Sequence, residues 1–262
     1  MSRFGPGLVV STEDGAATVT LSNTARRNAM TLGMWRALPG VLAGLAADPG
    51  VRLVVLTGEG DVFSSGADVA ELADPDVGPA LQDAALAAEE AVVAFPKPTV
   101  AAVRGFCVGG GCQLAVACDL RFAARGARFG VTPARLGVVY PPASTRRLVE
   151  LTGPGTAKHL LFSAELIDDE RALRTGLIDE LLPDGEALDA RVRDFAQVLA
   201  TRSRLTQAAA KEFAAGPPAP GRAAYWAEQA AASAETAEGA AAFLAGRAPR
   251  FGWSPASPPP PE

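Results

Sequence analysis

The sequence predicts an α/β fold in which buried strands lead through glycine-containing turns into helices. Two segments have the composition of strands covered on both faces, since VRLVVLT at 51–57 and TVAAV at 99–103 are short, apolar and rich in β-branched residues. Each is followed within a few residues by a turn and an apolar stretch that can start a helix. From residue 186 onward, apolar residues recur at helical spacing, so we expect a helical C-terminal region.

Composition limits the possible partners and the compartment. The 262 residues are 48% hydrophobic and carry a net charge of −5, which predicts one large core, an appendage and no nucleic-acid partner. No apolar run approaches the roughly 18 to 20 residues that span a bilayer, so we expect no membrane segment. Cys107, Cys112 and Cys118 have neither CxxC spacing nor a histidine cluster nearby. We therefore expect reduced thiols, no metal site and a cytoplasmic location.

The N-terminal part predicts a hairpin followed by a helix. The alternating segment ATVTL at 17–21 follows an Asp-Gly turn and is typical of a hairpin strand. We expect Asn28 to cap a helix from about Thr31 to residue 47, in which Pro39 could introduce a kink. Arg26 and Arg27 lie just before this helix, either as solvated charges or as phosphate ligands.

Two loops share one feature, because each leads directly into the N-terminus of a predicted helix. The loop SSGAD at 64–68 leads into a helix that Asp68 is well placed to cap, and the glycines at 109–111 lead into a second helix over 112–118. A helix N-terminus presents unpaired N–H groups that attract negative charge, and glycines let a ligand approach the backbone closely. Two such loops could form an oxyanion hole, although a simple packing turn is the alternative for the glycines.

Taken together, three motifs resemble the crotonase, or enoyl-CoA hydratase/isomerase, superfamily. They are GEGDVFSSGADVAEL, PKPTVAAVRGFCVGGGCQLAVACDLRFAARGARFG, and LGVVYPP followed by TRRL, and the similarity extends from RRNAM to EGAAAFLAGRAPRF. The resemblance implies a spiral of repeated ββα units, a helical C-terminal region and homotrimers or hexamers. It also implies an acyl-CoA thioester as ligand, with no cofactor beyond the coenzyme A of the substrate. The thioester oxygen would lie between the backbone N–H groups of Ala67 and Gly110.

The chain departs from the family pattern where the hydratases carry two glutamates. Gln113 and Pro133 stand at those positions. A positioned acid or base is worth roughly 10²- to 10⁴-fold in rate, so ordinary hydration is in doubt. Tyr140 matches the active-site tyrosine of methylmalonyl-CoA-type decarboxylases, which carry a histidine where this chain has Ala67. Three functions stay open: an enoyl-CoA hydratase or isomerase, a decarboxylase or hydrolase that uses Tyr140, and a non-catalytic acyl-CoA binder.

The remaining predictions concern coenzyme A and the domains. The resemblance places Phe243 against the adenine across a subunit boundary, and it leaves Arg26, Arg27 and Arg247 to offset phosphate charge, with Asp68 nearby. His159 matches no catalytic position of the family, so a surface or packing role is expected. We expect a spiral core over 1–196, a helical oligomerisation region over 197–253 and a proline-rich disordered tail over 254–262.

Overall fold

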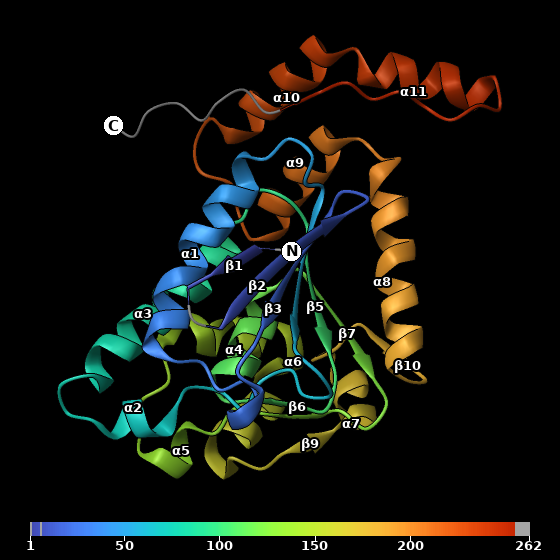
Figure 1. Ribbon diagram of the computed structural model, residues 1–262. Coiled ribbons are helices and arrows are strands. Elements are labelled where there is room, and N and C mark those ends of the chain that lie inside the picture. The colour runs from blue at the N-terminus through green and yellow to red at the C-terminus, as the bar shows by residue number, and fades with distance from the viewer. Residues whose placement is uncertain (1, 6, 255–262) are drawn as a thin grey trace.

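The computed structural model describes residues 2–5 and 7–254, and it has the predicted α/β architecture (Figure 1). A seven-stranded sheet runs in the order β1-β2-β3-β4-β5-β7-β10. The pairs β1–β2 and β2–β3 are antiparallel, and the remaining neighbours are parallel. Its strands are β1 Ser2–Phe4, β2 Leu8–Glu13, β3 Ala16–Leu21, β4 Leu53–Gly58, β5 Thr99–Val103, β7 Leu120–Ala124 and β10 Glu180–Leu182.

A second sheet of three short strands gives the fold its ββα repeat. It is formed by β6 Phe106–Val108, β8 Arg128–Gly130 and β9 Ile167–Asp168. In chain order β5 and β6 precede α4 Gly110–Ala117, and β7 and β8 precede α5 Pro133–Leu136. After β4, an isolated bridge between Ser64 and Cys107 takes the place of the second strand, and α2 Val69–Ala73 follows. The predicted spiral of ββα units is therefore confirmed.

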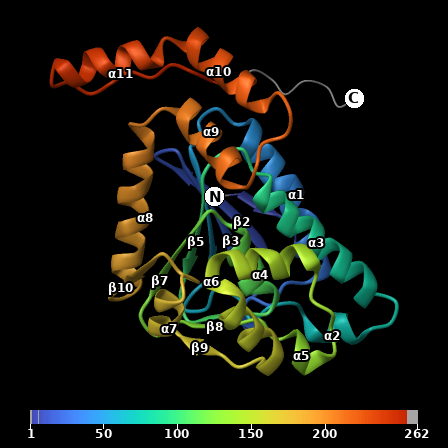
Figure 2. The same ribbon diagram turned by 180° about the vertical axis from the view of Figure 1, so that it is seen from behind.

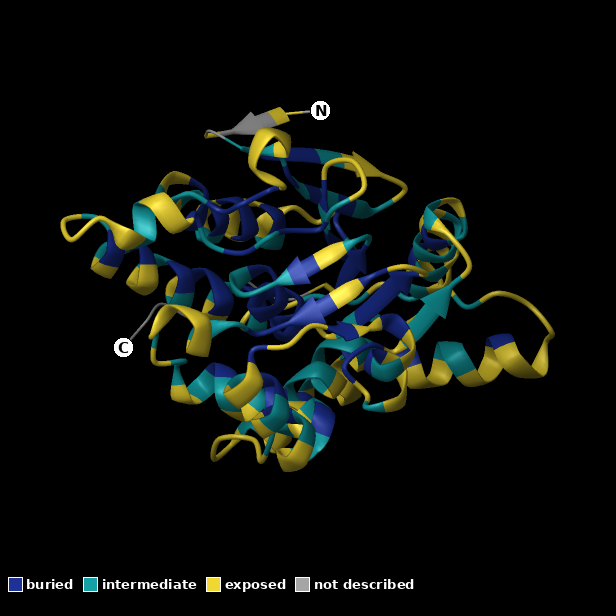
Figure 3. Cartoon of the chain, turned by 90° about the horizontal axis from the view of Figure 1, so that it is seen from below, coloured by how far each residue is buried: buried dark blue, intermediate teal, exposed yellow. Residues whose placement is uncertain are grey.

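Helices cover both faces of the long sheet, which explains why its strands are apolar on both sides. Alternate residues of β4 belong to two cores: Val54 and Leu56 pack on one side, while Leu53 and Val55 pack on the side covered by α8 Gly185–Ala200. Figures 1 and 2 show α1, α3, α4 and α6 on one side of the sheet and α8 on the other. Viewed from below, buried residues fill the centre of the molecule (Figure 3). The helices of the first side are α1 Leu32–Ala47, α3 Gly78–Val93, α4 and α6 Pro142–Ser163.

The last two helices of the described residues form a separate layer at one end of the molecule, and the helix before them packs against the core (Figure 1). The three C-terminal helices are α9 Arg204–Ala214, α10 Arg222–Ser233 and α11 Glu235–Leu244, within the region predicted to be helical. The proposed domain boundary after residue 196 falls inside α8 and stays a prediction, and residues 255–262 of the proposed tail lie outside the described residues. No helix in the described ranges is long and apolar enough to cross a membrane. Short helices also form at Thr24–Arg26 (η1) and at Asp169–Arg174 (α7).

The prediction that Asn28 caps α1 is wrong. Thr31 is the cap, since its hydroxyl accepts a hydrogen bond from Met34 N at 3.3 Å. Asn28 is buried in a left-handed conformation with φ 56°, and its amide donates to the carbonyl oxygens of Glu59 and Val62 at 2.9 and 2.6 Å. It therefore holds the loop after β4 rather than the end of a helix. Pro39 lies inside α1, as predicted.

Candidate active site

In the first loop, the Ala67 N–H points away from Met30, the residue with which Ala67 forms an isolated bridge. Met30 N donates to Gly66 O at 2.8 Å, and Asp68 N donates to Met30 O at 2.9 Å. In an extended segment the backbone groups of successive residues point to opposite sides. Because the residues on both sides of Ala67 bond to Met30, the Ala67 N–H faces the other way, and no acceptor for it occurs in the described part of the chain.

The second loop leaves the Gly110 N–H unpaired for a different reason. Gly110 is the first residue of α4, and the first intrahelical bond of that helix runs from Gln113 N to Gly109 O at 3.0 Å. The N–H groups before it have no helical partner. Gly109 itself has φ 54° and ψ −123°, a conformation that only glycine adopts without strain.

The two loops converge. A Cβ added at Gly66 would lie 3.1 Å from Gly110 N, and a Cβ added at Gly110 would lie 3.4 Å from Ala67 N. The same Cβ at Gly110 would be 2.9 Å from Cζ2 of Trp35, a fully buried side chain of α1 that packs under the turn. The structure thus brings close together the two loops whose N–H groups were singled out in the sequence.

Arg26 and Asp68 support the first loop. Asp68 is 3% exposed, and its carboxylate accepts hydrogen bonds from Ala70 N, Glu71 N and the Arg26 guanidinium. Burial by itself would raise the pKa of Asp68, but these hydrogen bonds outweigh it and hold the pKa below its ordinary value. Asp68 is therefore the predicted cap of α2, and Arg26 is already paired. Arg27 is exposed, with its guanidinium 5.8 Å from the centre of the Phe106 ring.

Gln113 belongs to a buried polar cluster that the sequence analysis missed. Its amide nitrogen lies 2.5 Å from Glu89 Oε2 and 3.3 Å from Ser144 Oγ. Glu89 comes from α3 and is fully buried, and Arg147 of α6 donates to its other oxygen at 2.5 Å. A signal was present in the sequence, because Glu89 falls at helical spacing on the same face as the buried residues Ala85 and Val92.

Tyr140 lies between α5 and α6, partly buried against the main core. Burial, reinforced by the neighbouring Cys112 and Glu89, raises the pKa of its phenol well above the ordinary value. As in any tyrosine of ordinary or raised pKa, the hydroxyl is protonated at neutral pH and can donate a hydrogen bond. Pro133 is the first residue of α5, a position that proline favours, and it offers no titratable group.

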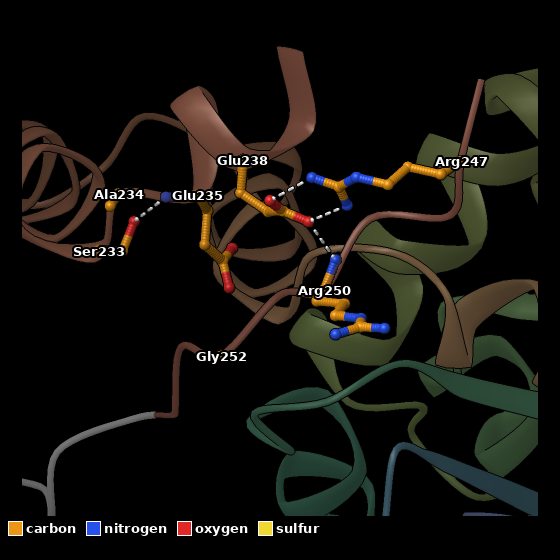
Figure 4. A pocket seen from close by; sticks show the side chains of 7 residues that line it. All are labelled: Ser233, Ala234, Glu235, Glu238, Arg247, Arg250 and Gly252. Atoms are coloured by element: carbon orange, nitrogen blue, oxygen red, sulfur yellow. Dashed lines mark hydrogen bonds and ion pairs between the residues drawn. The ribbon is translucent and has the colours of Figure 1, made fainter. Parts of the chain in front are cut away.

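Phe243 does not lie near the two converging loops. It is 85% exposed on α11, and Figures 1 and 2 show α11 at the opposite end of the molecule from α2 and α5. Arg247 is paired with Glu238 at 2.7 Å in a surface pocket beside α11 (Figure 4). Hydrogen bonds from Arg247 and from Arg250 N lower the pKa of Glu238 to about 2. The pocket is lined by Ser233, Ala234, Glu235, Glu238, Arg247, Arg250 and Gly252.

The histidine and the cysteines show no catalytic arrangement. His159 lies on α6, partly exposed, with Nε2 at 3.2 Å from Glu165 Oε2. The three cysteines are free and buried, and burial raises the pKa of Cys118 to about 12, far from a reactive thiolate. Across residues 2–5 and 7–254, no group of three or more potential metal ligands is found.

The ββα spiral defines the class of fold, and comparison with known proteins identifies the family. The family model for enoyl-CoA hydratase/isomerase matches residues 11–252, so the chain belongs to this family and is an enzyme of the hydratase/isomerase type. It is 34% identical to a crotonyl-CoA hydratase of Syntrophomonas wolfei, over 78% of this chain and 81% of the relative.

Two further relatives support the same conclusion. The chain is 33% identical to the 2,3-dehydroadipyl-CoA hydratase of Escherichia coli, over 78% of this chain and 80% of that enzyme. The crystal structure of a Hyphomonas neptunium protein of the enoyl-CoA hydratase/isomerase family superimposes with a TM-score of 0.88 at 36% identity. That comparison covers 95% of this chain and 98% of the other.

Proposed function

We propose that this enzyme binds an acyl-CoA thioester with the carbonyl oxygen between the N–H groups of Ala67 and Gly110, and that it stabilises the thioester enolate there. The single observation that supports this is that the two loops carrying these unpaired backbone donors lie close together. When an enolate forms, negative charge develops on the thioester oxygen. Fixed donors then bind the transition state more strongly than the substrate.

The proposed reaction class is hydration or double-bond isomerisation of an enoyl-CoA, as in the relatives. Gln113 and Pro133 cannot shuttle protons at neutral pH, so turnover by the two-glutamate route is not expected. A decarboxylase is the second candidate, because loss of CO₂ generates the enolate without a base at the α-carbon. Tyr140, which packs partly buried against the main core, is the candidate O–H donor for such a reaction, because a phenol is protonated at neutral pH.

A panel of acyl-CoA thioesters tests the proposal. Mass spectrometry would detect hydration, a double-bond shift by exchange of solvent deuterium, loss of CO₂, or free CoA. Calorimetry with a short acyl-CoA and with the free acid of the same chain provides the binding test. We expect heat from the thioester only, and no heat at millimolar thioester would contradict the proposed site.

Assembly, cofactor use and location are part of the proposal. Exposed Phe243 and Leu244, at 85% and 86%, support a homotrimer or hexamer in which α11 packs on another subunit and Phe243 meets the CoA adenine. Turnover that survives dialysis against a chelator would support a reaction that needs no cofactor beyond the CoA of the substrate. A cytoplasmic location is supported by the free cysteines.

A further inference from the structure

The direction of the Ala67 N–H depends on a hydrogen bond from Met30. The Ala67 nitrogen and the Gly66 carbonyl belong to the same peptide unit, and in a trans peptide the N–H and C=O groups point in opposite directions. Met30 N donates to Gly66 O at 2.8 Å, so the position of Met30 fixes where the Ala67 N–H points. A group that holds Met30 in place therefore acts on this donor without touching a ligand.

A closed ring of contacts holds Met30. Its carbonyl oxygen accepts a hydrogen bond from Asp68 N at 2.9 Å, and Asp68 caps α2, the short helix that carries Glu71. The carboxylate of Glu71 reaches back to the segment that follows Met30, where its Oε2 accepts from Leu32 N at 2.5 Å. The ring thus runs from Met30 along the chain to Leu32, across to Glu71 and back through Asp68.

Glu71 also completes the start of α1. Leu32 is the first residue of that helix, and the first N–H groups of a helix have no partner within it. Residues 32–35 hold no acidic side chain of their own, so Glu71 supplies negative charge from another helix at the end where the helix dipole favours it. The segment that Glu71 holds contacts both loops, because Met30 bonds to the first and Trp35 packs under Gly110 in the second.

We propose that Glu71 is a positioning residue: by accepting the Leu32 N–H it holds Met30, and through Met30 it aims the Ala67 N–H at the thioester oxygen. Glu71 acts through the backbone and not as an acid or a base. The inference rests on the proposed function, because it assumes that the thioester oxygen binds between Ala67 N and Gly110 N.

Two substitutions at residue 71 separate the hydrogen bond from the rest of the side chain. Glu71→Ala removes the acceptor, whereas Glu71→Gln keeps one, since the amide oxygen of glutamine can accept from Leu32 N. With the best substrate of the acyl-CoA panel, we expect Glu71→Ala to lower kcat roughly 10- to 10²-fold, because a misplacement of about 1 Å can cost 10²-fold. KM should change little, since the aimed donor acts mainly in the transition state, and Glu71→Gln should restore most of the rate.

A second measurement does not need turnover. Butyryl-CoA that is isotope-labelled at the thioester carbonyl reports on its own hydrogen bonds, because they lower the stretching frequency of that carbonyl in infrared difference spectra. We expect a smaller lowering in Glu71→Ala than in the unmodified protein and in Glu71→Gln. A residue that only stabilised α1 would leave this frequency unchanged.

Asp184→Ala is the matched control for a lost helix cap. Asp184 Oδ1 accepts from Ala187 N at 2.8 Å at the start of α8, which has 16 residues like α1. Figures 1 and 2 show α8 on the other side of the sheet from α1. The midpoint of urea unfolding should fall in Asp184→Ala and in Glu71→Ala, whereas only Glu71→Ala should lose rate and carbonyl shift. Circular dichroism shows that each variant is folded.

Three outcomes would overturn the inference. If folded Glu71→Ala keeps the rate and the carbonyl frequency of the unmodified protein, Glu71 is only a helix cap and the proposed function stands. If Asp184→Ala or Glu71→Gln is as slow as Glu71→Ala, the hydrogen bond to Leu32 N does not position the donor. If the unmodified protein binds no butyryl-CoA, or binds it without lowering the carbonyl frequency, the proposed function fails and this inference fails with it.

Discussion

Replacement of Gly110 by proline tests the oxyanion donor directly. Gly110 is the first residue of α4 and does not have a positive φ, and proline is well tolerated at this position of a helix. The substitution removes the N–H and leaves the helix intact. Loss of one oxyanion donor costs on the order of 10² to 10³ in rate, or about 2.7 to 4 kcal/mol.

The steric effect of the same change must be separated from the loss of the donor. Any Cβ at residue 110 would lie 2.9 Å from Trp35 Cζ2, so overpacking would cost about 1 to 3 kcal/mol of stability. Gly110→Ala introduces this contact and keeps the N–H, which makes it the matched control. Trp35→Phe in both backgrounds provides space for the added atoms.

The assay follows the loss of the conjugated enoyl thioester by absorbance, with the best substrate of the panel. Binding of cinnamoyl-CoA gives a second measurement, because hydrogen bonds to the thioester oxygen shift the absorption of the conjugated system to longer wavelength. We expect the proline variant to be about 10²- to 10³-fold slower than the alanine variant and to show a smaller shift. A folded proline variant with the rate and shift of the alanine variant would refute the donor role of Gly110.

Three further predictions follow from the structure. Crotonyl-CoA hydration should be more than about 10²-fold slower than in a relative with both glutamates. Gln113→Glu alone should not restore the rate, because the new carboxylate would face Glu89 and share a proton with it. Gln113→Glu combined with Glu89→Gln should raise the rate. If the single variant hydrates as fast as the double variant, the paired-carboxylate argument is wrong. Burial, together with the nearby Arg204, lowers the pKa of Lys97 from 10.5 to about 8. Between pH 8 and pH 10.5 the folded state therefore binds fewer protons at Lys97 than the unfolded state does. The contribution of Lys97 to the free energy of unfolding consequently rises with pH in this window. Urea unfolding at pH 8 and 10 should show a smaller rise for Lys97→Met, and an identical rise would contradict the shift. Asp at both Phe243 and Leu244 should reduce the mass measured by light scattering to that of the monomer, and an unchanged mass would show that α11 is not at the interface.

The sequence alone determined the elements and the candidate donors, because both depend on local chemistry. Apolar β-branched runs specify β4 and β5, and Asp68 caps the helix that follows it within a few residues. Glycine at 109 is required by a backbone conformation that is itself local, so the turn before Gly110 could be recognised from the chain.

Tertiary structure decided what depends on contacts between distant segments. Ala67 and Gly110 are separated by 43 positions in the chain, and only the strand order brings their N–H groups together. Helical spacing indicates that Glu89 is buried, but its partner Gln113 comes from another helix and could not be inferred. The misassigned Asn28 has the same cause, because its hydrogen bonds reach residues more than 30 positions away. Short-range preferences fix helices and strands, whereas a buried polar group takes its role from whichever groups the packed core places beside it.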